Sequence, residues 1–410
     1  MNGPSASLST LLVIACLILV AGCTSEDKFE GDYPKIATVN TTSKVSPTPT
    51  PGAGANGTTD ELIPPIEGCG KGNTTRPEGC MVVPGNGTTE APAPDMMEND
   101  TVRPEELAPD QEELAALGPY PDFITSNEDY FITRIGSVPE IDPSTYRLSI
   151  TGLVKNPREF TLEELRALDL VELPLTVECI GKSPKGPAIS TAVWMGFSLY
   201  DLLDSLGLDK SATGVKYRAA DGYYASHPME QVRDNGIIGA LYMNGEVTPP
   251  LHGFPLRMLN PGYYGVKQPM WVTEIEVIDG PIKDYWGDGG WDVSPPMAID
   301  STIFFPDDGV EVKVGDVLEM GGAAFGGTRV ARVQVTADRG RIWHDAEMVG
   351  RMDVDNVWAF WKAGIIFPAP GDYTVHVRAT DINGNTQIED DPVKYDGNSD
   401  WPMLEVQATE

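Results

Sequence analysis

Apolar and polar positions alternate in a mixed pattern across residues 119–283. Thr161 and Glu164 have the spacing of a capping box, which predicts the start of a short helix. Ser198 and Gly207 are typical N-cap and C-cap residues and predict a second helix over 198–206. Short runs rich in β-branched and aliphatic residues predict strands between Gly- and Pro-rich loops, at 147–152, 173–179, 214–219 and 270–277. The pattern predicts a mixed α/β domain.

In residues 284–410, apolar and polar side chains alternate with a period of two residues. Val310, Val312 and Val314 alternate with charged residues, and comparable alternation recurs at 332–336 and 373–379. Gly-Asp and Asn-Gly turns separate the runs, as expected for half-buried antiparallel strands. This rhythm is typical of an immunoglobulin-like sandwich, here without paired cysteines. The predicted fold class is therefore α+β, with the mixed domain followed by an all-β sandwich.

An uninterrupted apolar run occupies residues 8–22. It is shorter than the roughly 20 residues of a membrane-spanning helix, and its position favours a signal peptide over residues 1–22. Small residues directly before Cys23 resemble a lipobox, in which Cys23 would carry lipid and become the new N-terminus. The alternative is an uncleaved membrane anchor. Both interpretations place the rest of the chain outside the cytoplasm, at the outer face of the membrane.

Residues 23–118 are rich in Thr, Pro, Gly and Asn and lack a sustained hydrophobic period. Such a segment cannot bury enough apolar surface to offset its ordering entropy, so we expect a flexible stalk. N-x-S/T sequons are confined to it and predict glycosylation of the stalk; a Thr/Asn-rich linker without glycans is the alternative. The sequon residues are Asn40, Asn56, Asn73, Asn86 and Asn99.

Charge excludes several partners. The 410 residues include 29 Lys+Arg and 61 Asp+Glu, a formal net charge of −32. Proteins that bind nucleic-acid backbones or anionic lipids electrostatically need basic patches, so neither nucleic acid nor a polybasic membrane contact is expected. An anionic ligand would need a local basic pocket, because the overall field repels anions.

The positions of the five cysteines in the chain suggest different roles for them. Cys16 leaves with the signal peptide, while Cys69 and Cys80 flank a short stalk loop and could form a disulfide in an oxidising exterior. Cys179 is then the one cysteine of the globular part. Taken alone, such a residue is more often an inert core thiol than a reactive group. No zinc-type spacing, nucleotide-binding loop or GxSxG motif accompanies it.

Ordered segments around Cys179 nevertheless resemble the sulfite oxidase superfamily of molybdopterin-dependent oxidoreductases. The resemblance spans residues 119–408 and is densest at Asn244-Gly245-Glu246, His252-Gly253, Pro255-Leu256-Arg257 and Gly265-Val266-Lys267. It includes Thr176-Val177-Glu178-Cys179 as the metal-cysteine segment. It implies a molybdenum–molybdopterin cofactor, with Cys179 as the thiolate ligand of the metal. The sandwich corresponds to the family's dimerisation domain and implies a possible homodimer.

The resemblance also implies roles for individual residues. A thiolate suits a soft metal, and the dianionic phosphate of the pterin suits the guanidinium fork of an arginine or the point charge of a lysine. Tyr285 is expected to donate a hydrogen bond to substrate, and Lys182 to stabilise charge near the metal. The expected cofactor-binding residues are Asn127, Tyr130, Phe131, Asp221, Ser226, His252, Arg257, Lys267 and Gln268.

Two departures limit the substrate prediction. Family members that oxidise sulfite carry arginines just after the metal cysteine, where this chain has Lys182 and Lys185, and the usual basic residue before Trp271 is Met270. We therefore predict two-electron oxygen-atom transfer on a small sulfur or nitrogen compound. No haem motif is present, so electrons would pass to a separate carrier. The alternatives are a methionine sulfoxide reductase of envelope proteins and a non-catalytic surface or adhesion protein that retains the fold.

Overall fold

The computed structural model describes residues 81–83, 109, 111–181, 188–350, 352–393, 395–397 and 399–410. Within the chain, Pro77–Glu410 form one compact unit. Several predicted features lie outside the described residues, and these are Lys182, Cys23, Cys69, Cys80 and the sequon residues. Among the described residues, no helix has both the length and the apolar character needed to cross a membrane.

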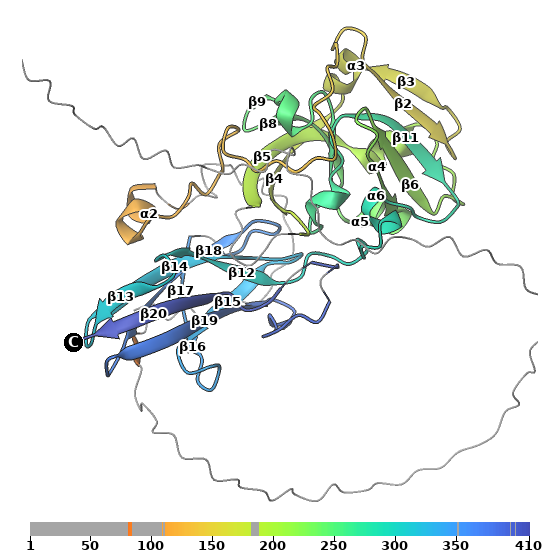
Figure 1. Ribbon diagram of the computed structural model, residues 1–410. Helices are drawn as coiled ribbons and strands as arrows, with labels where there is room; N and C mark the ends of the chain where they lie inside the picture. Colours follow the sequence, from red (N-terminus) through yellow and green to blue (C-terminus); the bar gives the residue numbers. More distant parts are fainter. Residues whose placement is uncertain are drawn as a thin grey trace, which may run out of the picture. The chain divides into compact units, whose positions relative to one another are not determined.

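The first domain contains two five-stranded sheets within the described residues (Figure 1). One has the strand order β3-β2-β11-β6-β7, with β2 and β11 parallel and the other pairs antiparallel. Its strands are β2 (Arg147–Gly152), β3 (Arg158–Thr161), β6 (Gly214–Ala219), β7 (Tyr224–Pro228) and β11 (Val272–Ile278).

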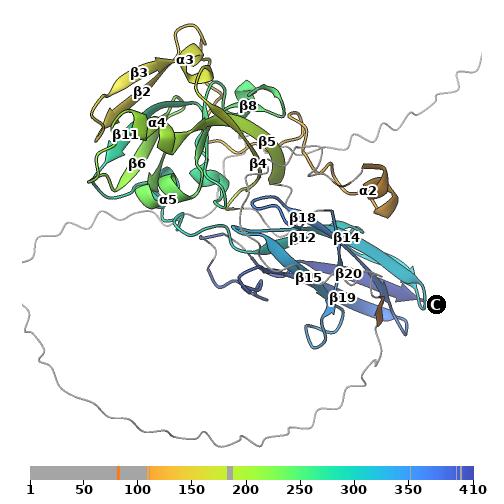
Figure 2. The ribbon, with the colours of Figure 1, turned by 180° about the vertical axis from the view of Figure 1, so that it is seen from behind.

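The other sheet has the order β10-β8-β5-β4, and β9 pairs with β8. Its strands are β4 (Leu170–Glu178), β5 (Ile189–Ser198), β8 (Ile238–Met243), β9 (Glu246–Val247) and β10 (Arg257–Leu259). The short helices of the domain are α3 (Leu162–Arg166), α4 (Leu199–Ser205), α5 (Met229–Asp234), η1 (Pro250–His252), η2 (Gly265–Lys267) and α6 (Tyr285–Asp288). Helices α4 and α5 lie against each other, and α5 contacts β6 and β7 (Figure 2).

Local sequence signals account for several of these elements. Thr161 and Glu164 form the predicted capping box at α3, and the Ser198 side chain accepts a hydrogen bond from the backbone N–H of Asp201 at the start of α4. Strand β11 begins two residues later than predicted. The reason is that Trp271 has a φ of 53°, a left-handed conformation that interrupts an extended strand.

Strand β5 was not predicted, because both of its faces are covered. Phe197 lies in a core shared with β2, β6 and β11, while Trp194 and Ala192 lie in a second core with β4 and β8. A strand buried on both faces loses the period-two signal that marks a half-exposed strand.

The second domain is the predicted β-sandwich. Its two five-stranded sheets, counted within the described residues, have the orders β1-β18-β14-β12, with β17 beside β18, and β13-β20-β19-β15-β16. Val333, Trp361 and Val375 from both sheets meet in one core. The strands are β1 (Met81–Val83), β12 (Asp300–Phe305), β13 (Val310–Lys313), β14 (Val317–Phe325), β15 (Val330–Thr336), β16 (His344–Asp345), β17 (Glu347–Val349), β18 (Ala359–Ile366), β19 (Gly371–Asp381) and β20 (Met403–Thr409).

Ordered structure extends into the segment that was assigned to the stalk. Helix α2 (Gln111–Leu117) lies before residue 118, and β1 pairs with β18. Leu114 is buried in a cluster with Phe123, Trp358 and Phe360. A seven-residue helix is too short to show a clear hydrophobic period, and its stability comes from this tertiary packing.

Candidate active site

A cavity that is open to solvent lies in the first domain, with about 650 Å³ of empty space when the open solvent is included. Its wall is built from the loop at 131–135, the end of β4, the turn before β7, the start of β10, the η2 segment and α6. Five of the predicted site residues line it together, although they come from distant parts of the sequence. They are Phe131, Cys179, Asp221, Arg257 and Gln268.

Cys179 follows the last residue of β4 directly. Its backbone N–H donates to the carbonyl oxygen of Ala188, just before β5, at 3.0 Å, which fixes the thiol at the end of a strand pair. The residue is partly buried and forms part of the cavity wall. Cys179 is thus the soft ligand that the described part of the cavity offers to a metal.

Arg257 is a buried cation without a carboxylate partner among the described residues. Its side chain is 5% exposed, and its Nε has no hydrogen-bond partner there. The guanidinium group lies 5.1 Å from the ring centre of Trp194 and 5.9 Å from that of Tyr130. Burial lowers the pKa of Arg257, but an arginine stays protonated in proteins. A buried cation that faces a cavity in this way calls for an anion, and the phosphate of the pterin fits.

Tyr130, His252 and Asn127 lie behind this wall. His252 Nε2 is 2.6 Å from the carbonyl oxygen of Asn127, so Nε2 must carry the hydrogen and donate. Burial lowers the pKa of His252, which keeps the ring neutral, and burial raises the pKa of Tyr130 to about 12. The Tyr130 ring stacks on Phe131 at 5.6 Å. These three residues hold the segment that brings Phe131 to the cavity.

Gln268 and Asp221 line the cavity in different ways. Gln268 is buried, and its amide donates to the carbonyl oxygens of Asn260 and Tyr263 at 2.7 and 2.9 Å, which ties the preceding loop. Asp221 is partly exposed and accepts the backbone N–H of Tyr223 at 3.0 Å. Partial burial raises the pKa of Asp221.

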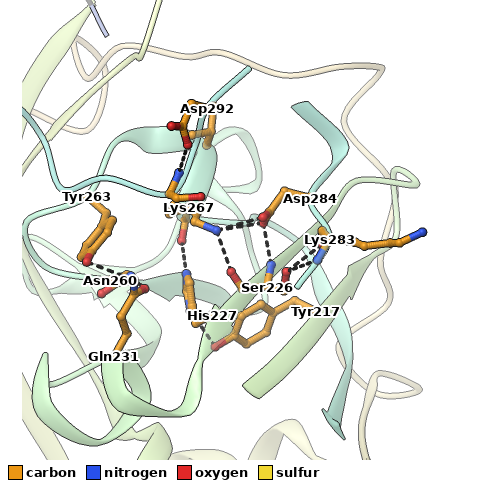
Figure 3. Close-up of polar contacts among 12 residues, drawn as sticks. Tyr217, Ser226, His227, Gln231, Asn260, Tyr263, Lys267, Lys283, Asp284 and Asp292 are labelled. Carbon is orange, nitrogen blue, oxygen red and sulfur yellow. Dashed lines mark hydrogen bonds and ion pairs between the residues drawn. The ribbon is translucent and has the colours of Figure 1, made fainter. Parts of the chain in front are cut away.

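Three other predicted residues do not line the cavity. Lys267 is buried, and its ammonium group pairs with Asp284 (Figure 3). Ser226 exchanges hydrogen bonds with the backbone of Lys283 at 2.7 and 3.0 Å. Tyr285 is 37% exposed and packs edge-on against Trp286 at 5.5 Å between ring centres.

Sequence reasoning gave no role to several residues of the wall. Tyr223 donates from its hydroxyl to the carbonyl oxygen of Val266 at 2.7 Å, and it lies close enough to Cys179 for the thiol to contribute to the raised pKa of Tyr223, after burial and two carboxylates. Trp286, Met270 and Arg134 also line the cavity. The available signal was the occurrence of aromatic residues side by side in the sequence, at 223–224 and 285–286, next to Gly-containing segments.

Family comparisons agree with this geometry. Residues 135–286 match the oxidoreductase molybdopterin binding domain, and residues 293–396 match the Mo-co oxidoreductase dimerisation domain. The first match contains Cys179, Asp221, Arg257 and Gln268. Fold and site therefore define a molybdopterin-binding oxidoreductase domain followed by a dimerisation domain, as the predicted α+β fold class required.

Individual relatives narrow the family further. The chain is 30% identical over 312 residues to mitochondrial sulfite oxidase of Rattus norvegicus, covering 65% of this chain and 57% of the relative. It is 30% identical over 331 residues to the NAD(P)H nitrate reductase of Hordeum vulgare, covering 65% and 37%. The two matched domains are those of molybdopterin-dependent oxidoreductases, and they are similar to the corresponding parts of sulfite oxidases and nitrate reductases. The chain spans little more than half of the sulfite oxidases and less of the nitrate reductases.

A solved structure shares the fold. The sulfane dehydrogenase SoxCD of Paracoccus pantotrophus superposes with a TM-score of 0.59 at 22% identity, over 70% of this chain and 82% of that chain. The predicted fold, cofactor and enzyme class are confirmed for these two domains. The residue assignments remain predictions.

Proposed function

We propose that this protein is an extracytoplasmic oxidoreductase that transfers an oxygen atom to or from a small sulfur or nitrogen compound. Electrons would be exchanged with a separate carrier. The observation that carries the proposal is the convergence of the Cys179 thiol and the uncompensated Arg257 guanidinium on one cavity. A soft metal ligand and an anion site are the two protein contributions that a molybdenum–pterin cofactor requires.

The bound cofactor would supply the two-electron oxygen-transfer chemistry, and the chain's own residues would position it. Cys179 would bind the metal as a thiolate, and Arg257 would bind the phosphate through its planar fork. His252 would fix the segment that carries Phe131. Asp221 would face the bound group from the turn before β7, where partial burial raises the pKa of its carboxyl group.

Among small sulfur and nitrogen compounds, an uncharged substrate is the second candidate beside an oxyanion such as sulfite. The composition of the cavity wall favours the uncharged substrate. Ile132, Val266, Pro269 and Met270 make this wall largely apolar. Among the described residues the lining cations are Arg134 and Arg257, and the proposal commits Arg257 to the cofactor. A wall with this composition suits an uncharged S-oxide or N-oxide, including methionine sulfoxide in envelope proteins, better than an oxyanion.

The proposed location depends on the N-terminal sequence. The apolar run at 8–22 and Cys23 support a lipoprotein anchored at the outer face of the cell membrane. The sequons support glycosylation of the stalk, and Cys69 and Cys80 are candidates for a disulfide there. The dimerisation domain supports a homodimer.

Metal and pterin analysis of the full-length protein, purified without chelators, tests the proposed function. We expect about one molybdenum and one releasable pterin per chain, with the Cys179 thiol protected from a maleimide until the metal is removed. In Cys179→Ser, oxygen-transfer activity with an artificial electron dye should fall by at least about a hundredfold. A folded protein without molybdenum, whose thiol reacts freely, would instead favour the non-catalytic surface protein. A screen of sulfite, S-oxides and N-oxides then separates the two substrate classes.

A further inference from the structure

Strand β7 and the turn before it form hydrogen bonds with several segments of the cavity wall. The Tyr223 hydroxyl, in the turn before β7, donates to the carbonyl oxygen of Val266 at 2.7 Å. His227 Nε2 lies 3.0 Å from the carbonyl oxygen of Lys267 and therefore donates to it. Both acceptors belong to η2, whose residues Gly265 and Val266 line the cavity. The η2 wall is thus bound to β7 through its backbone.

The segment that leads into α6 is fastened to the same strand. The backbone N–H of Ser226 donates to Asp284 at 2.7 Å, and the Ser226 hydroxyl exchanges hydrogen bonds with the backbone of Lys283 (Figure 3). Two residues after Asp284, Trp286 lines the cavity, and Tyr285 lies between them. Ser226 therefore holds the segment that leads to Trp286 against β7.

A buried ion pair joins the two fastened segments directly. Lys267 Nζ lies 3.0 and 3.1 Å from the two carboxylate oxygens of Asp284 and 2.7 Å from the carbonyl oxygen of Ser226. The two side chains are only 3% and 7% exposed. An ammonium group has three donors, and these contacts use all of them. The charge of Lys267 is balanced as well, whereas Arg257 has no carboxylate partner among the described residues.

We propose that Lys267 and Asp284 are a positioning pair, which fixes Trp286 in the cavity wall, and that Lys267 is not a ligand of the cofactor. The expected effect of the pair on catalysis rests on the proposed function. The pairing itself rests only on the contacts described above. In this proposal Arg257 binds the phosphate of the cofactor, and the charge of Lys267 is neutralised by Asp284. A family-based assignment would have given both cations to the cofactor.

Four full-length variants test the pair: Lys267→Met, Asp284→Leu, the double variant, and Lys362→Met/Glu347→Leu as a control. The control removes an ion pair of the same 3.0 Å length from the sandwich. Each single variant leaves one buried charge unpaired and should be strongly destabilised in urea unfolding, whereas the double variant should recover most of the loss. Additive losses in the double variant would contradict the pair.

Cofactor content separates the positioning role from cofactor binding. We expect the double variant to hold as much molybdenum and pterin per folded chain as the wild type. Loss of both groups from the double variant would overturn the proposal, because it would make Lys267 a cofactor ligand. The control variant should keep its cofactor.

The position of Trp286 in the cavity wall can be measured separately. In the double variant, acrylamide quenching of Trp286, obtained by difference from the matching Trp286→Phe proteins, should rise about twofold, since α6 loses one attachment. With the best substrate of the screen, KM should rise about tenfold while kcat stays within about threefold. Unchanged quenching and unchanged KM would refute the positioning role. If the wild type held no molybdenum, the proposed function would fail, while urea unfolding and quenching would still decide the pair.

Discussion

At the scale of single residues, charge balance distinguishes the two buried cations of the site region. The Lys267 ammonium group meets a carboxylate and a carbonyl, so its burial is compensated within the protein. The Arg257 guanidinium lies near the rings of Tyr130 and Trp194 and lines the cavity. Because an unpaired buried charge costs free energy, Arg257 is a residue whose presence stability does not explain. We interpret it as a group kept for a ligand.

Replacing Arg257 with Met should therefore separate stability from cofactor binding. The aliphatic side chain can pack on Trp194 and Tyr130 without a desolvated charge. We expect the free energy of unfolding of the cofactor-free protein to fall by less than about 1 kcal/mol, or to rise. Molybdenum and pterin content should fall severalfold or more.

Met258→Ala in the same strand is the comparison for Arg257→Met. Met258 is fully buried, so its truncation should cost about 2–5 kcal/mol in the same urea titration. If Arg257→Met cost as much as Met258→Ala and kept its cofactor, Arg257 would be a structural residue instead.

His227 makes stability depend on pH. It is fully buried between the Tyr217 hydroxyl, 2.9 Å from Nδ1, and the carbonyl oxygen of Lys267. Burial and the Lys267 charge hold the pKa of His227 well below its ordinary value of 6.5. The unfolded chain therefore binds a proton below about pH 6.5 that the folded chain excludes, so stability is present above that pH and falls as pH decreases.

We expect His227 alone to lower the free energy of unfolding by about 1.4 kcal/mol between pH 7.5 and pH 5.5. In His227→Gln this contribution to the pH dependence should disappear, although the variant is less stable at every pH. Urea titrations at both pH values measure it. A pH dependence identical in the two proteins would show that His227 has the same pKa in the folded and unfolded chains, which would contradict its exclusion of the proton.

At the scale of elements, strand β5 connects the two cores of the first domain. It pairs with β4 on one side and β8 on the other, and the register with β8 shifts between Met195 and Gly196. Gly196 faces the backbone of Gly239 so closely that no Cβ fits between the strands. The glycine is therefore needed for close strand approach at this irregularity.

Gly196→Ala should destabilise the protein by at least about 2 kcal/mol, because β5 and β8 would have to separate. Gly136→Ala is the matched control, since a Cβ there would contact nothing within 4 Å, and it should change stability by less than about 1 kcal/mol. Thermal or urea unfolding compares the two. Equal stability of both variants would mean that the β5–β8 pair opens at little cost.

At the scale of the whole molecule, the chain combines a strong negative charge with a locally positive cavity. The net charge of −32 repels anions at long range, and Arg257 and Arg134 provide the opposite sign at the wall. The two matched domains lie within one compact unit, Pro77–Glu410. The predicted lipid anchor would hold this unit at the membrane surface.

The anchor is tested by replacing Cys23 with Ser. Wild-type protein expressed in its source cells should partition into the detergent phase of Triton X-114, and its N-terminal peptide should begin at a lipid-modified Cys23. Cys23→Ser should lose the lipid mass and retain residues 1–22. A wild-type N-terminus upstream of Cys23 would favour the uncleaved anchor.

Local sequence determined the elements whose signals lie within a few residues. The capping box at Thr161, the N-cap at Ser198 and the alternation at Val333 and Val335 each produced the predicted element, because hydrogen bonds and side-chain periodicity act over one or two turns. The ordered resemblance around Cys179 added the family and its cofactor.

Tertiary structure alone decided where those residues meet and what they pair with. Strand β5 is apolar on both faces and helix α2 is short, so neither has a periodic signal. Lys267 pairs with Asp284, whereas Arg257 has no such partner in the part of the chain that the structure describes, and both outcomes depend on segments that β7 and β10 bring together in space. Residue type specifies that a charge is present, but only the fold determines whether that charge is compensated inside the protein or left for a ligand.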